Sequence, residues 1–208
     1  MDEQELKAWR IRLRADLIAR RAGTLPERRA AWGTSIGLQL ERLLADVSGR
    51  IVAFCWPYQG EFDARPTIMG CLERGARAAL PVVVAPRQPM IFREWNPGTK
   101  MVPGVYDIPV PADSPEVLPD IVLAPLAGFD ERGHRLGYGG GFFDRTLAAI
   151  QPRPVTIGIG FELARVATIH PRWHDIPMNY IVTEAGTFQR DATRLVPATP
   201  SAQTHRCG

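Results

Sequence analysis

The sequence predicts an α/β fold in which helices cover a mostly parallel sheet. Apolar runs of strand length recur along the chain, separated by segments of helical period. The run over residues 50–56 is apolar after its first residue, as in a parallel strand that is buried on both faces. A chain of 208 residues is long enough for one domain of this class.

The first element is a predicted helix over residues 3–22, which forms an N-terminal helical segment ahead of the sheet. Apolar residues recur there at helical spacing, and Gly23 ends the run. Arg10 and Arg14 are four residues apart and therefore share one face. Taken alone, these two arginines also fit a solvated basic surface.

Helices and strands follow in turn. Pro26 suits the first turn of a second helix, which we expect to run to about residue 46. Asp63 is the expected N-cap of the next helix. The further helices are predicted over residues 64–75 and 142–150. Strands are predicted over residues 50–56, 78–85, 90–95, 121–124, 154–161 and 180–183.

Two segments lack a regular period. Residues 97–120 are proline-rich and are predicted to form a long ordered loop, which would cover a substrate. Residues 186–208 lose apolar periodicity, and we predict a loosely ordered tail. The chain is thus divided into a domain over residues 1–185 and a tail over residues 186–208.

A glycine-rich loop lies between a predicted strand and a predicted helix, in the segment RGHRLGYGGGFFDR at residues 132–145. Four of its glycines fall within five residues, at Gly137, Gly139, Gly140 and Gly141. Glycine allows backbone N–H groups to approach a ligand closely, and a loop that opens a helix directs them at phosphate. The alternative is a tight turn, which the composition fits equally well.

Charged residues surround this loop. Arg132, Arg135 and Arg145 bring guanidinium groups to it, and Asp144 offers a hard oxygen ligand of the kind that Mg²⁺ prefers. These groups indicate a nucleotide triphosphate with its metal. The loop has neither the Gly-Lys-Ser/Thr ending of a P-loop nor the spacing of a Rossmann fingerprint.

The segment GFDERGHRLGYGGGFFDR, residues 128–145, resembles the nucleotide loop of the 5-formyltetrahydrofolate cyclo-ligase family. That pattern is a Phe-Asp pair, a short turn, then Arg-Leu-Gly-x-Gly-x-Gly, two aromatic residues and Asp. Shorter matches are the Phe-x-x-Trp strand, GVYDIPVPA and HDIPMNYIVTE, so the resemblance spans about residues 5–184. It implies a single three-layer α/β domain and conversion of 5-formyltetrahydrofolate to 5,10-methenyltetrahydrofolate with ATP and Mg²⁺.

The resemblance also implies the residues that bind ATP and its metal. In the family, the first helix carries a lysine and, four residues later, an arginine that bind phosphate; Arg10 and Arg14 match these positions. Asp144 and Asp175 match metal-binding positions. The implied ATP-binding residues are Arg10, Arg14, Arg135, Gly137, Tyr138, Gly139, Gly140, Gly141, Phe142, Phe143 and Arg145. No residue is expected to act as a covalent catalyst.

The resemblance places the reduced folate in the loop after the first strand. There the family contacts the pterin through an apolar residue and a glutamate, which Trp56 and Glu61 match. A carboxylate suits the adjacent ring N–H and amino donors of a pterin, and a tryptophan offers a flat wall. Tyr138 and Phe142 are expected near the formyl group. Trp95 belongs either to this pocket or to the core.

Departures from the family pattern at Arg10, Ala64, Phe143 and Asn179 leave two alternatives open. One is a cyclo-ligase-like paralogue that acts on a different substrate. The other is a non-catalytic folate- or nucleotide-binding protein.

Composition limits the cellular setting and the partners. The three cysteines have no metal-like spacing, no apolar run approaches the length of a membrane span, and the first residues are charged. We therefore expect a cytoplasmic protein without a membrane partner. We also expect a monomer. The basic first helix would also suit nucleic acid, but aromatic and basic residues do not interleave, so we expect no such partner. His170 and His174 suggest zinc by spacing, but Pro171 disfavours one helical face.

Overall fold

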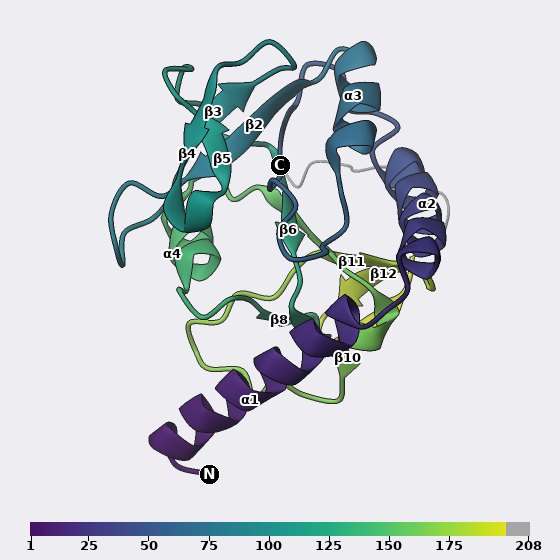
Figure 1. Cartoon of the computed structure of the whole chain (residues 1–208), viewed down its shortest axis with the longest axis vertical. Coiled ribbons are helices and arrows are strands. Elements are labelled where there is room, and N and C mark those ends of the chain that lie inside the picture. Colours follow the sequence, from purple (N-terminus) through teal and green to yellow (C-terminus); the bar gives the residue numbers. More distant parts are fainter. Residues whose placement is uncertain (199–208) are drawn as a thin grey trace.

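A computed structural model describes residues 1–198 and has an eight-stranded sheet at its centre (Figure 1). The strand order is β13-β12-β11-β9-β6-β1-β2-β3. These strands are β1 (Ile51–Ala53), β2 (Arg77–Val82), β3 (Ile91–Trp95), β6 (Ile121–Pro125), β9 (Val155–Ile159), β11 (Tyr180–Thr183), β12 (Gly186–Asp191) and β13 (Arg194–Pro197).

The central strands of this sheet run in parallel, which confirms the predicted fold class. β2, β1, β6, β9 and β11 pair in parallel, whereas β3 and the β12–β13 hairpin are antiparallel additions at the two edges. From β1 the chain runs outward to β2 and β3, and then returns to β6 on the other side of β1. The sheet therefore has its topological switch point between β1 and β6, where ligands bind in open α/β sheets.

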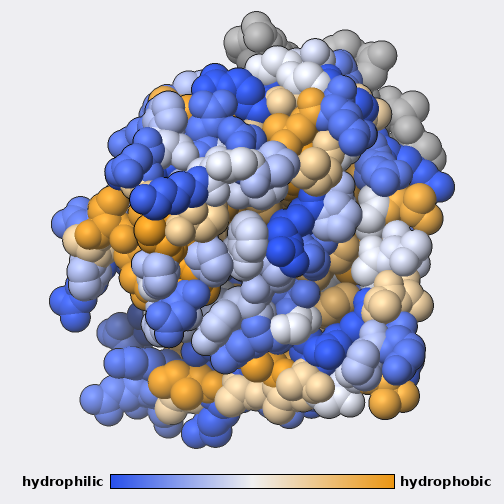
Figure 2. Space-filling view, turned by 45° about the horizontal axis from the view of Figure 1, so that its top comes forward, coloured by the Kyte–Doolittle hydropathy of each residue, from blue (hydrophilic) through white to orange (hydrophobic). Residues whose placement is uncertain are grey.

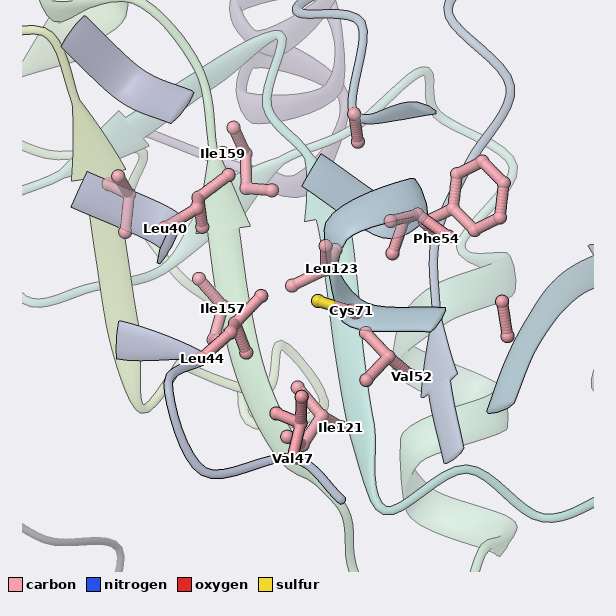
Figure 3. Packing of buried hydrophobic residues seen from close by; sticks show 14 of the residues in the cluster. Leu40, Leu44, Val47, Val52, Phe54, Cys71, Ile121, Leu123, Ile157 and Ile159 are labelled. Atoms are coloured by element: carbon pink, nitrogen blue, oxygen red, sulfur yellow. The ribbon is translucent and has the colours of Figure 1, made fainter. Parts of the chain in front are cut away.

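Four α-helices are described, and three of them cover the sheet. They are α1 (Glu3–Ala22), α2 (Pro26–Leu43), α3 (Arg65–Glu73) and α4 (Phe142–Ala149). α2 and α3 share one core cluster with Val52 and Leu123, as Figure 3 shows. α4 shares the other cluster with Ala53 and Val122. Neighbouring strand residues thus face opposite layers, as the period of two requires, and the domain has three layers.

Two small sheets accompany the main one. The first contains β7 (Gly128–Asp130), β8 (Arg135–Leu136) and β10 (Arg165–Val166), with the short helix η2 (Glu162–Ala164) just before β10. The second is a hairpin of β4 (Met101–Pro103) and β5 (Pro109–Pro111), joined by η1 (Val105–Asp107). Residues 97–120 are therefore more regular than the predicted loop.

α1 lies along the lower edge of the molecule and projects beyond it at its N-terminal end (Figure 1). A capping box between Asp2 and Glu5 begins the helix. Leu17 is buried with Leu136 and Ile169 in a small cluster. These apolar contacts fix the helix against the segment that precedes the glycine-rich loop.

The prediction of a tail over residues 186–208 is wrong for residues 186–197. β12 pairs with β11 and forms a hairpin with β13, while Phe188 and Leu195 pack against the core. An edge hairpin buries only part of each strand, so its apolar alternation is weak in the sequence. Residues 199–208 of the predicted tail lie outside the described residues.

Other boundaries shift by a few residues. Ala64, rather than Asp63, occupies the N-cap of α3, although Asp63 Oδ1 accepts the Arg65 N–H at 3.0 Å.

Trp95 is buried in the core, edge-on to Phe54 with ring centroids 5.2 Å apart.

No helix among the described residues is long and apolar enough to cross a membrane. On the face shown in Figure 2, hydrophobic side chains form small groups that hydrophilic ones separate. This face presents no continuous hydrophobic surface.

Candidate active site

An open cleft of about 1640 Å³ lies beside the switch point of the sheet. It is lined by α1, the loop after β1, the β4–β5 hairpin, the glycine-rich loop and residues 172–176. Every residue that the resemblance assigned to ATP, folate or metal lines this one cleft. Arg132 does not line it, so its expected place beside Arg135 and Arg145 is wrong.

The glycine-rich loop needs glycine at two positions because of its backbone conformation. Gly139 and Gly141 have φ values of 95° and 62°, which L side chains rarely adopt. A Cβ atom at Gly139 would lie 3.4 Å from the Arg14 guanidinium. Gly141 is the N-cap of α4, and no side chain caps that end. The loop therefore presents backbone N–H groups and a helix dipole to the cleft.

Arginine side chains hold this loop in place. Arg14 Nε donates to the Gly137 carbonyl oxygen at 2.5 Å, and Arg145 donates to the Gly140 carbonyl oxygen. Burial lowers the pKa of Arg14, and the charge of Arg10 lowers it further. Crowded cations of this kind favour a polyanionic ligand.

Arg135 lies next to the loop. Its Nη2 atom is 3.4 Å from Asp144 Oδ2, and its guanidinium carbon is 4.8 Å from the centroid of the Phe143 ring. Within residues 1–198, the buried Nε atoms of Arg135 and Arg145 have no hydrogen-bond partner. Buried donors without partners match a site that is completed by an anionic ligand.

Two carboxylates predicted for the metal come together although they are far apart in sequence. Asp144 Oδ1 accepts the Ile176 N–H at 3.2 Å, which places it next to Asp175 in the chain. Asp175 Oδ2 forms an ion pair with Arg10 at 2.6 Å. Burial acts to raise the pKa of Asp175, but the hydrogen bond from Arg10 and other contacts hold it below its usual value.

This pair of carboxylates fits Mg²⁺ better than a metal held by protein groups alone. Among the described residues, no three His, Cys, Asp or Glu side chains form a metal cluster. Mg²⁺ commonly takes only one or two carboxylates and completes its shell with phosphate oxygens and water.

Arg10 also donates to the carbonyl oxygens of Ile169 and His170. It therefore anchors α1 as well as lining the cleft.

Glu61 lies on the other side of the cleft and is half-buried. Its Oε1 accepts the Tyr138 hydroxyl at 2.6 Å, and its Oε2 accepts the Tyr58 N–H at 3.0 Å. Burial raises the pKa of Glu61, while the Tyr138 hydrogen bond and the charge of Arg21 oppose that shift. Glu61 is therefore no exposed acid that caps the next helix.

Trp56 is half-buried beside Glu61. The Arg65 guanidinium lies 4.7 Å from the centroid of its ring, and Trp95 packs edge-on at 6.3 Å. These contacts fix the ring as one wall of the cleft.

Two further groups were not predicted from the sequence: Arg21, which lies behind the cleft, and Tyr106, which lines it. Arg21 is 4% exposed and donates to the Tyr138 hydroxyl at 2.8 Å. In the sequence nothing distinguishes it from its exposed neighbour Arg20. Tyr106, at the tip of the β4–β5 hairpin, is 69% exposed and has a φ of 58°. Only the matched segment GVYDIPVPA drew attention to its surroundings.

The fold and the cleft define a class of protein: an α/β domain with a glycine-rich loop that lines a cleft beside the switch point of its sheet. Residues 6–184 match the model of the 5-formyltetrahydrofolate cyclo-ligase family. The chain therefore belongs to the 5-formyltetrahydrofolate cyclo-ligase family, which makes it an enzyme of the ligase class. This confirms the resemblance.

Similar proteins agree with this membership. The 5-formyltetrahydrofolate cyclo-ligase of Escherichia coli K12 is 30% identical over 177 residues, covering 82% of this chain and 97% of the relative. The Mycolicibacterium smegmatis cyclo-ligase is 31% identical over 147 residues, covering 66% and 75%. The NMR structure of Aquifex aeolicus 5,10-methenyltetrahydrofolate synthetase, 22% identical, has a TM-score of 0.74 over 96% of this chain and 99% of that one, which supports the fold.

Proposed function

We propose that this protein cyclises 5-formyltetrahydrofolate to 5,10-methenyltetrahydrofolate in a reaction that depends on ATP and Mg²⁺. The observation that carries the proposal is one cleft with two unlike halves. A glycine loop with arginines forms one half, and Glu61 with Trp56 forms the other. Family membership supports the same reaction.

The reaction requires an oxygen to leave a formyl carbon. Transfer of the γ-phosphoryl group of ATP to the formyl oxygen converts a poor leaving group into phosphate. The folate N10 then attacks the activated carbon, phosphate and ADP are released, and the five-membered ring closes. The protein must align two ligands and stabilise charge, and needs no covalent chemistry of its own.

On the nucleotide half, the N–H groups of residues 137–141 cradle phosphate. Arg14, Arg135 and Arg145 neutralise its charge, together with Arg10 at the far end of the cleft. Asp144 and Asp175 are the carboxylates that would hold Mg²⁺, which neutralises phosphate charge when bound.

On the folate half, Glu61 accepts hydrogen bonds from the pterin, and Trp56 packs against its ring. Tyr138 and Phe142 lie at the junction of the halves and contact the formyl group. We further propose that the protein acts as a cytoplasmic monomer, without nucleic-acid or membrane partners.

The test is the near-ultraviolet absorbance of the methenyl product, followed with purified protein and 5-formyltetrahydrofolate. Absorbance should grow only when ATP and Mg²⁺ are both present. If no product forms although ATP raises the melting temperature, the protein is a family relative with another substrate. If neither effect occurs, the glycine loop is only a structural turn.

A further inference from the structure

Arg21, in the last turn of α1, connects three segments that lie behind the cleft. Its Nη2 donates to the Tyr138 hydroxyl at 2.8 Å, and its Nε donates to the Gln59 carbonyl oxygen at 3.1 Å. A longer bond of 3.4 Å joins Nη1 to the Leu126 carbonyl oxygen. The glycine loop, the loop after β1 and the residue after β6 thus meet at one buried guanidinium.

The hydrogen bonds from this guanidinium have a fixed direction. Arginine only donates, so the Tyr138 oxygen must accept from Arg21 and direct its own proton elsewhere. The nearest acceptor is Glu61 Oε1, at 2.6 Å. Arg21, Tyr138 and Glu61 therefore form a one-way chain that ends on the carboxylate.

We propose that Arg21 is a positioning residue for Glu61: it fixes the Tyr138 hydroxyl as a donor and so sets the orientation of the carboxylate that receives the substrate. The substrate part rests on the proposed function. Arg21 follows Arg14 by seven residues, about two turns, on the same helix. α1 therefore holds a phosphate-binding arginine and the support of the folate-binding carboxylate on one rigid element.

Charge gives this role a measurable signature. The ionisable groups that face Glu61 are Arg21 from α1, Tyr138 from the glycine loop and Cys55 from the loop after β1. The charge of Arg21 and the Tyr138 hydrogen bond both oppose the rise that burial causes in the pKa of Glu61. Without Arg21 the pKa of Glu61 must rise further.

The experiment is a ¹³C NMR titration of glutamate carboxyl groups, with the Glu61 signal assigned by Glu61→Gln. Arg21→Gln should raise the pKa of Glu61. Arg20→Gln, the matched control one residue earlier on an exposed face, should leave it unchanged. An unchanged Glu61 titration in folded Arg21→Gln protein would overturn the proposal.

Arg21→Lys keeps the charge and guards against a variant that does not fold. It should hold the pKa of Glu61 near the wild-type value while losing the fork that orients Tyr138. In kinetics, Arg21→Gln should raise the KM for 5-formyltetrahydrofolate about tenfold, as expected for a lost bond to a charged group, with a smaller effect on ATP. Equal losses for both ligands would contradict a positioning role.

Tyr138→Phe tests whether Arg21 acts through the tyrosine. Once the hydroxyl is absent, Arg21→Gln should add little to the folate KM, which is a coupling that double-mutant cycles measure. Fully additive effects of the two substitutions on the folate KM would contradict the hydrogen-bond chain from Arg21 through Tyr138 to Glu61. If the wild type forms no methenyl product, the proposed function fails, while the titration still decides whether Arg21 controls Glu61.

Discussion

Glu61 is partly buried but is expected to carry a negative charge at neutral pH. Burying that charge lowers the free energy of unfolding. Burial raises its pKa above the ordinary value. A raised pKa means that the stability contribution is present when the carboxyl is protonated, at low pH, and is lost as pH rises through the folded-state pKa. At neutral pH the ionised side chain therefore weakens the fold, and we attribute its presence to ligand binding.

Glu61→Gln should consequently raise the melting temperature at neutral pH, because the amide carries no charge to desolvate. The difference from the wild type should vanish at pH values below the ordinary glutamate pKa. The same variant should raise the KM for 5-formyltetrahydrofolate more than that for ATP. Thermal unfolding over a pH series and steady-state kinetics provide the check; a destabilised variant at neutral pH would contradict it.

The pKa of Asp175 is shifted in the opposite direction from that of Glu61. Its folded-state pKa is lowered against the effect of burial by its bond to Arg10, so its contribution exists above the ordinary aspartate pKa and is lost as pH falls through the lowered value. Asp175→Asn should lower the melting temperature at neutral pH, and the difference should disappear in strong acid. A constant difference across that pH range would rule out the ion pair as its cause.

At this scale the sequence predicted which residues line the cleft, because the family resemblance over about residues 5–184 includes their positions. It did not predict their contacts. Arg10 and Asp175 are separated by 165 positions, and their ion pair exists only because α1 folds across the segment near Asp175. The role of Arg21 was not predicted for the same reason: its burial depends on the position of Tyr138, far along the chain.

At the scale of elements, the glycine loop joins α4 to the small sheet and depends on positive φ. Gly139→Ala would strain the backbone and press a methyl group toward Arg14. Strain of this kind costs of order 1–3 kcal/mol, so we expect the KM for ATP to rise about tenfold or more.

Gly37→Ala is the matched control, since it lies in α2 where a Cβ would meet nothing within 4 Å. It should stabilise the protein by about 1 kcal/mol through helix propensity and leave kinetics unchanged. If Gly139→Ala behaves like Gly37→Ala, the loop does not bind phosphate.

The β12–β13 hairpin is a structural element in place of the predicted tail. A chain that ends after residue 185 loses Phe188 and Leu195 from the core and exposes the edge of β11. We expect a loss of about 2 kcal/mol or more in the free energy of unfolding. A chain that ends after residue 198 keeps every described contact and serves as the control; denaturant unfolding separates the two.

Elements with a strong signal were predicted closely, and weak ones were not. The first helix has an apolar stripe and a terminal glycine, and its observed bounds are Glu3–Ala22. The edge hairpin has only half-buried strands, and its burial is decided by pairing with β11 rather than by its own composition.

At the scale of the whole molecule, the order of the strands explains why two differently composed loops meet at one cleft. The loop after β1 and the connection from β6 to α4, which contains the glycine loop, start from neighbouring strands at the switch point. α1 then closes over both, with Arg14 on one and Arg21 between them. This strand order could not be read from the sequence, since apolar runs show which segments are strands but not which strands are neighbours.

The most direct test of the central claim is the growth of methenyl absorbance by the wild type, Glu61→Gln and Gly139→Ala, each with ATP and folate varied separately. We expect product only with ATP and Mg²⁺, a folate defect in Glu61→Gln and an ATP defect in Gly139→Ala. Product without ATP, or identical defects in the two variants, would contradict a cleft with one half for each ligand.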